Sequence, residues 1–269
     1  MTIVEIFGFI ASALIGLVLG IMGGGGAILT VPILVYLFAR PAETATGYSL
    51  CIVGTSALIG SFAYIRKHLI DFRAALLFGV TSIIAVFLTR NQLLPLIPKS
   101  LFSVGSLAVT RGNAMLFFFS AIMIFSAISM IRRKKVTPED ASGEIQPVRL
   151  AILGLLVGVV AGLVGAGGGF MIVPALVLFA GLEMKKAIGT SLLLIGANSL
   201  FGFVGEMQRN PDIEWGFLAA VTGLAVLGIF AGTYLSKFFS GEKLKPAFGY
   251  FVMVMGVLIV IFELTKSKS

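Results

Sequence analysis

The sequence predicts an all-α polytopic membrane protein, built as two inverted repeats of about five helical segments each. Three observations lead to this prediction. The chain is 58% hydrophobic and 12% charged, with a mean hydropathy of +1.07, whereas soluble domains carry about 25% charged residues. Long stretches lack charge altogether, and the two halves of the chain resemble each other. The solvent for most of this chain must therefore be lipid.

Charge-free stretches mark the candidate membrane segments. Residues 6–39 and 150–182 contain no Asp, Glu, Lys, Arg or His, and a membrane-spanning helix needs about 20 apolar residues. Further spans are expected at 44–65, 72–89, 112–131, 188–205, 215–236 and 247–262. The N-terminus lacks a cationic start, so we expect no cleaved signal peptide. The lone Cys51 excludes an internal disulfide. The net charge of +8 fits loop Lys and Arg that orient membrane helices, and it could also attract anions.

An offset of 142 positions aligns two glycine clusters, because MGGGGAILTVP at 22–32 then faces VGAGGGFMIVP at 164–174. Outside the clusters the matched pairs include Gly16/Gly158, Gly20/Gly162, Gly47/Gly189 and Ser49/Ser191. We therefore expect a first transmembrane repeat at 1–131, a second at 150–269, and a polar linker at 132–149 that is rich in Lys and Arg and hence cytoplasmic. Equivalent loops carry opposite charge character, which favours inverted repeats with both termini external.

The glycine-containing run of each repeat is expected to enter the membrane and return. As one straight helix, residues 6–39 would extend about 51 Å at 1.5 Å per residue, against a hydrocarbon core of about 30 Å. Two short helices that meet near mid-membrane fit better. Each repeat then has five helical segments, and the chain has ten. Residues 90–111, with Arg90 at their start, are expected to form an external loop.

The two breaks are the predicted substrate site. A broken helix at membrane depth must face protein, water or a ligand, because lipid offers no hydrogen bonds. Free backbone N–H groups at the start of the next helix attract an anion. The residues in question are Gly24, Gly25, Gly26, Ala27, Gly167, Gly168, Gly169 and Phe170. For the flanking pairs Gly16/Gly20 and Gly158/Gly162, close helix packing is the favoured interpretation.

Polar side chains on the following helix of each repeat could assist, namely Ser49, Thr190, Ser191 and Asn198. Ser and Thr equally often donate to a carbonyl of their own helix, so both interpretations stay open. Glu206, near the end of a span, is explained by snorkelling to the interface, with proton coupling as the alternative. One His, one Cys and no paired carboxylates within the spans argue against catalysis. We expect no catalytic residue, cofactor, metal ion or nucleic-acid partner.

Three motifs of the second half, GAGGGFMIVPALV at 165–177, AIGTSLLLI at 187–195 and DIEWGFLAAVTG at 212–223, resemble the sulfite exporter TauE/SafE family. The first half departs from them, with Tyr48 where the second has Thr190. The resemblance implies a transporter of a small sulfur-containing or organic anion, such as sulfite, thiosulfate or sulfoacetate, in the bacterial inner membrane. The expected partners are that anion and the lipid bilayer. An anion channel with the same site and a non-transporting membrane scaffold are the alternatives.

Overall fold

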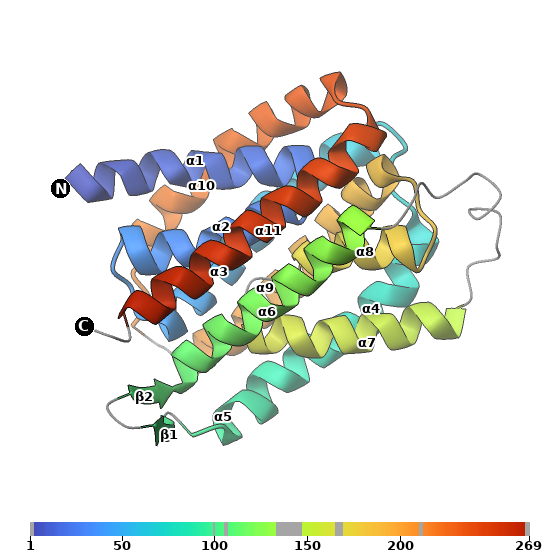
Figure 1. Cartoon of the computed structure of the whole chain (residues 1–269). Helices are drawn as coiled ribbons and strands as arrows, with labels where there is room; N and C mark the ends of the chain where they lie inside the picture. The colour runs from blue at the N-terminus through green and yellow to red at the C-terminus, as the bar shows by residue number, and fades with distance from the viewer. Residues whose placement is uncertain are drawn as a thin grey trace.

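The computed structural model describes residues 3–98, 100–104, 107–132, 147–164, 169–209 and 212–266. These residues form a bundle of helices with one short β-hairpin (Figure 1). Seven of the described helices are long and apolar enough to cross a membrane, judged by length and composition. The predicted class, a polytopic helical membrane protein, is confirmed.

The first half begins with α1 (Ile3–Met22) and α2 (Gly25–Pro32), which a π-helical turn, η1 (Ile33–Leu37), extends. Next come α3 (Ala42–Ile65) and α4 (Phe72–Leu88), and α4 continues through the π-helical η2 (Thr89–Leu93) into α5 (Leu94–Leu96). Strands β1 (Ser100–Val104) and β2 (Leu107–Thr110) pair antiparallel ahead of α6 (Arg111–Arg132). The loop expected at 90–111 therefore begins later, because helical structure continues past Arg90.

The second half contains α7 (Pro147–Val164), α8 (Gly169–Leu178), α9 (Met184–Arg209), α10 (Trp215–Leu235), its 3-10 extension η4 (Ser236–Phe238), and α11 (Gly241–Lys266). If each helix is counted with its continuous extension, the described residues hold five helical segments before residue 133 and five after residue 146. This is the number that the broken glycine runs predict.

The first glycine run folds back on itself as a helical hairpin. Gly26 of α2 packs on Leu19 of α1, and further along the hairpin Gly8 faces the ring of Phe38, so α2 and η1 return antiparallel to α1. Gly23 makes the reversal possible, because its φ of 69° is one that side chains rarely adopt. With 20 residues, α1 reaches the length of a full span, while the returning segment Gly25–Leu37 is shorter.

Helices α3 and α9 form the centre of the bundle and run antiparallel, since Gly54 packs on Leu200 while Gly196 packs on Leu58. Around them α1 lies along α10, α4 along α7, and α6 along α11 (Figure 1). The outer helices expose large apolar side chains, among them Phe7, Leu76, Phe125, Leu227 and Val254. Such faces suit a lipid solvent and not water.

Close helix packing explains the two pairs of flanking glycines, as expected. A Cβ built on Gly20 would lie 2.7 Å from the carbonyl oxygen of Ile229, and one on Gly158 would lie 2.5 Å from the carbonyl oxygen of Ser82. A Cβ on Gly16 would overlap the carbonyl group of Ala225, and one on Gly162 would lie 2.7 Å from Thr89 Cβ. These glycines let α1 approach α10, and α7 approach α4, at backbone distance.

Several backbone hydrogen bonds recur at the offset that relates the two glycine clusters. The N–H of Arg40 donates to Leu34 O (2.9 Å), and the N–H of Leu182 donates to Leu176 O (3.1 Å). The residue before each donor has a positive φ, 52° at Ala39 and 67° at Gly181. The returning helices of the two halves thus end in the same way. The repeat boundaries and the inversion of the repeats stay predictions.

Candidate functional site

The first break consists of two residues between α1 and α2. The N–H of Gly23 donates to Leu19 O (2.8 Å) and so closes the last turn of α1. Gly24 is the N-cap of α2 and provides no side-chain cap. The N–H groups of the first helical turn therefore have no intrahelical acceptor and no cap from a side chain of their own N-cap residue. These amides are what the break can offer to an anion.

The structure brings the first break against the second half of the chain. A Cβ built on Gly23 would lie 2.7 Å from Ser191 Oγ of α9. A Cβ built on Gly169, the first residue of α8, would lie 3.1 Å from Gly24 Cα. The beginnings of α2 and α8 and one face of α9 thus converge. Of the other predicted residues, Gly167 and Gly168 lie outside the described residues, as does the side chain of Phe170.

Gly25, Gly26 and Ala27 are all buried in the first turns of α2. A side chain at Gly25 would meet Val18 Cγ1 at 3.2 Å and Met22 Cβ at 3.3 Å, both on α1. One at Gly26 would meet the backbone of α1. The Cα atoms of these two glycines therefore face α1, and only their backbone amides can belong to the site.

The candidate hydroxyls are engaged in different ways. Ser49 Oγ donates to Thr46 O and Ser191 Oγ donates to Ile188 O, each at 2.8 Å. A serine hydroxyl has one hydrogen, so either residue must exchange this bond to donate to an anion. Ser191 lies against Gly23, which makes it the polar side chain best placed beside the described break.

Thr190 and Asn198 have partners away from the break. The N–H of Asp71 donates to Thr190 Oγ1 (2.9 Å), where α4 begins. Ser82 Oγ of α4 lies 3.0 Å from Asn198 Oδ1, both buried, and donates either there or to its own helix. The two side chains join α9 to α4, and neither is among the nearest neighbours of Gly23, the described glycine of the first break with a positive φ. Contact with α4 is a tertiary feature that residue type and spacing do not reveal.

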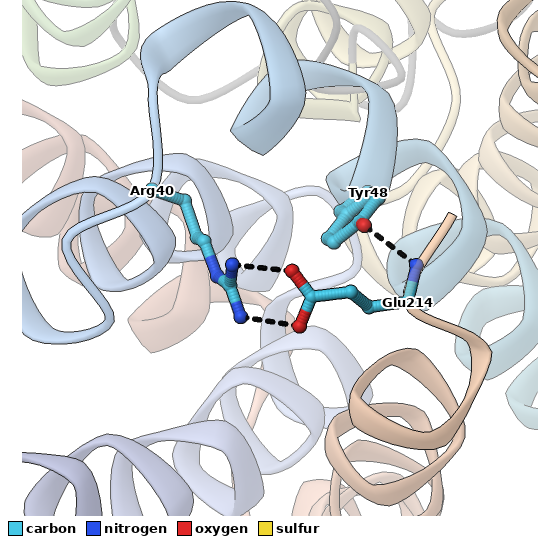
Figure 2. Close-up of polar contacts among 3 residues, drawn as sticks. All are labelled: Arg40, Tyr48 and Glu214. Atoms are coloured by element: carbon cyan, nitrogen blue, oxygen red, sulfur yellow. Dashed lines mark hydrogen bonds and ion pairs between the residues drawn. The ribbon is translucent and has the colours of Figure 1, made fainter. Parts of the chain in front are cut away.

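The contact made by Thr190 has a counterpart in the other half. The N–H of Glu214, just ahead of α10, donates to Tyr48 Oη (2.9 Å), as Figure 2 shows. The Glu214 carboxylate also accepts hydrogen bonds from both terminal nitrogens of Arg40, with 2.6 Å between Nη2 and Oε2. The guanidinium lies over the ring of Phe217, 4.9 Å from its centroid. The end of the hairpin that α1, α2 and η1 form is thereby held to the start of α10.

A second ion pair lies deeper and was not predicted. Arg90 Nη1 is 3.0 Å from Glu206 Oε2, and the two side chains are 1% and 14% exposed. The expectation that Arg90 starts an external loop is wrong, because η2 continues the helix and turns this residue inward. Glu206 does not snorkel to the interface as an isolated charge, because it has this buried partner.

Lysines gather at the opposite end of the bundle. Tyr64 Oη donates to Gly20 O (2.8 Å) and lies 3.1 Å from Ser236 Oγ, which brings the chain after α3 beside η4. Burial lowers the pKa of Lys67, and the neighbouring charges of Lys237 and Lys185 lower it further. This end is electropositive, whereas the two ion pairs of the other end are internally neutralised.

Comparison with known proteins gives the chain its family. The sequence profile of the family described as sulfite exporter TauE/SafE matches residues 8–259. A "Probable membrane transporter protein" of Xylella fastidiosa (strain 9a5c) is 28% identical over 258 residues, which cover 93% of this chain and 92% of the relative. The "Probable membrane transporter protein YdhB" of Bacillus subtilis (strain 168) is 26% identical and covers 92% and 96%. No solved structure matches the chain. The chain is thus a multi-pass protein of the inner membrane and belongs to the sulfite exporter TauE/SafE family of membrane transporters.

Proposed function

We propose that this protein is a carrier that exports a small sulfur-containing or organic anion, such as sulfite, thiosulfate or sulfoacetate. The single observation that supports this most is the approach of Gly24 to Gly169, where α2 and α8 begin. Two helix N-termini directed to one buried region favour a negative charge there. The proposed site combines the amides of both breaks with the hydroxyl of Ser191. The family supplies the substrate class. Transport, and not catalysis, is the proposed activity.

We further propose that residues 1–131 and 150–269 are inverted repeats around this site, joined by a cytoplasmic linker. The antiparallel course of α3 and α9 supports the inversion, because these helices are repeat equivalents. The reciprocal contacts of Tyr48 with Glu214 and of Thr190 with Asp71 support it as well. Single cysteines at His68 and Ile213, which lie at equivalent turns, should then react with an impermeant thiol reagent from opposite sides of the membrane.

Counterflow in proteoliposomes tests the carrier. Vesicles that contain the purified protein and a high internal concentration of unlabelled thiosulfate should transiently accumulate external radiolabelled thiosulfate, with a rate that saturates. A channel would conduct the anion without counterflow, and a scaffold would give no flux above that of protein-free vesicles. Acetate in place of thiosulfate serves as the control for anion class.

The variant Ser191→Ala tests the site itself. Loss of a hydrogen bond to a charged group costs about 1.5–3 kcal/mol, so the apparent affinity should fall at least tenfold. Ser120→Ala is the matched control, because Ser120 is buried in α6 and donates to Phe117 O as Ser191 donates to Ile188 O. Equal affinity in both variants would refute the site while leaving transport intact.

Gly169→Ala is the complementary test of the space between the two breaks. Its methyl group would meet Ile195 Cδ1 at 2.7 Å, which can rotate away, and Gly24 Cα at 3.1 Å, which can give little. We expect the protein to fold and the transport rate to drop. Unchanged transport would mean that the substrate passes elsewhere.

A further inference from the structure

The pair Arg90–Glu206 combines three features that a merely structural ion pair does not need. It is buried, with 1% of the Arg90 side chain exposed. Arg90 lies in a π-helical turn, and such turns concentrate at functional sites. Both residues also lie within candidate membrane spans, Phe72–Leu96 and Met184–Gln208, where ionisable side chains are costly and mark substrate pathways by default.

The position of the pair relates it to the second glycine break. A Cβ built on Gly162, in the last turn of α7, would lie 2.7 Å from the Cβ of Thr89, the residue before Arg90. On the other side, a Cβ built on Gly47 of α3 would lie 2.6 Å from Glu206 Cγ. Gly162 thus leaves space for Thr89, and Gly47 leaves space for the side chain of Glu206. Thr89, next to Arg90 in the chain, thus packs on the last turn of α7, just ahead of the second break.

The physical chemistry of this pair favours exchange over permanence. Replacing a buried ion pair by apolar side chains is often neutral or stabilising, so stability alone is a weak reason to keep one. An arginine guanidinium is charged at any physiological pH and presents a planar fork of donors. That fork fits the oxygens of sulfur and phosphorus oxyanions as well as it fits a carboxylate. Glu206 therefore occupies the position that an oxyanion would take.

We propose that Arg90 binds the transported oxyanion and that Glu206 is its internal competitor. The carboxylate neutralises Arg90 in the empty carrier and leaves when the oxyanion pairs with the guanidinium. This inference rests on the proposed transport of a small anion and adds a charged binding residue that the sequence motifs do not include. It also gives the empty carrier a neutral interior, which lowers the cost of moving without substrate.

The competitor role makes a prediction that a structural role does not. Removal of the charge of Glu206 should tighten anion binding, because the oxyanion no longer has to displace a carboxylate. For Glu206→Gln we expect an apparent affinity for thiosulfate at least fivefold higher than wild type, in the usual range of coupling between two sites. For Arg90→Gln we expect loss of binding, and for Arg90→Lys an intermediate loss. If the ion pair only holds α4 to α9, all these variants lose thermal stability and keep the wild-type affinity.

The experiment is a titration of the full-length protein in detergent with sodium thiosulfate, read by isothermal calorimetry and by thermal shift, with sodium acetate as the control. The matched control variants are Arg40→Gln and Glu214→Gln, which remove the exposed ion pair at the same end of the bundle. They should leave the affinity unchanged. If Glu206→Gln unfolds, the double variant Arg90→Gln/Glu206→Gln replaces it, since it buries no charge and should fold without binding thiosulfate.

Each result has a defined meaning. Tighter binding by Glu206→Gln with loss of binding by Arg90→Gln supports the inference. Wild-type affinity in Arg90→Gln, or in the double variant, overturns it and leaves the proposed transport standing. If the wild-type protein binds none of sulfite, thiosulfate and sulfoacetate, the proposed function fails first, and this inference fails with it.

Discussion

Gly158 lets α7 approach α4 closely, and its replacement tests how these helices pack. In Gly158→Ala the new methyl group would lie 2.5 Å from Ser82 O, 2.7 Å from Ala85 Cβ and 2.8 Å from Ser82 Cα. Ordinary van der Waals contact begins at 3.4 Å, so the helices must separate by about 0.9 Å at this point (3.4 minus 2.5). Neither the backbone of α4 nor a Cβ atom can rotate away.

The magnitude can be worked from that displacement. A radial gap of about 0.5–1 Å forfeits a quarter to a half of each dispersion contact, and overpacking of this kind typically costs about 1–3 kcal/mol. Since 1 kcal/mol corresponds to about 2–4 °C in a domain of roughly this size, Tm should fall by several degrees. Fluorescence-detected thermal unfolding of the purified protein in detergent measures this.

Gly223→Ala is the matched control on α10, because a Cβ at Gly223 meets nothing within 4 Å. Alanine has the higher helix propensity, by at most about 1 kcal/mol, so this variant should equal or slightly exceed wild type in Tm. If Gly158→Ala unfolds at the same temperature as Gly223→Ala, then α7 and α4 are not in backbone contact, and the packing argument is refuted.

Two further predictions concern the ends of the bundle. Thr190→Val and Tyr48→Phe each remove the acceptor for a backbone N–H at the start of α4 or α10, so each should lower the free energy of unfolding by about 1 kcal/mol. Because the two contacts share no partner, the double variant should show additive losses. Lys67→Gln should raise Tm near pH 7: the folded state lowers the pKa of Lys67, so protonation opposes folding and stability rises as pH increases towards 10.5. The gain should shrink in high pH or high salt and be absent in Lys186→Gln, whereas a gain that ignores pH would contradict the electrostatic origin.

The membrane class and the helical segments were predictable because they depend on local properties of the chain. Lipid leaves a polar backbone no partner outside its own helix, so apolar length alone marks a span. The glycine clusters marked the two breaks because consecutive glycines disfavour a helix. A broken helix inside the membrane then needs partners from protein, water or a ligand. Ser191 was one of several polar candidates on the helix after the break, and the structure brings it against Gly23.

The direction of individual side chains was not predictable. Residue type made Thr190, Ser191 and Asn198 equal candidates, yet only Ser191 contacts the described break, while the other two join α9 to α4. Neighbouring positions on a helix point about 100° apart, so the choice among them depends on which helix packs on which face. That information is tertiary.

Arg90 was misplaced for a different reason. It comes after an apolar span and precedes Asn91, Gln92 and two prolines within eight residues, which is a usual sequence context of a loop. One π-helical turn adds a residue to the helix and rotates the residues after it, so a side chain expected at the surface turns inward. The identity of its partner, 116 positions later in the chain, appears only when α4 and α9 lie side by side.

Equivalent positions in the two halves of the chain differ in charge, although the halves contain the same number of helical segments. At the offset of 142 positions Glu206 corresponds to Tyr64, whose hydroxyl donates to Gly20 O at the end of α1. The first half therefore has a neutral phenol at this position, and the second half has a carboxylate that pairs with a guanidinium. A symmetric pair of helix N-termini would bind an anion equally from either break. The proposed binding by Arg90 makes the two halves unequal, so an anion held by its guanidinium should lie beside η2 and the last turns of α9 and not beside Tyr64.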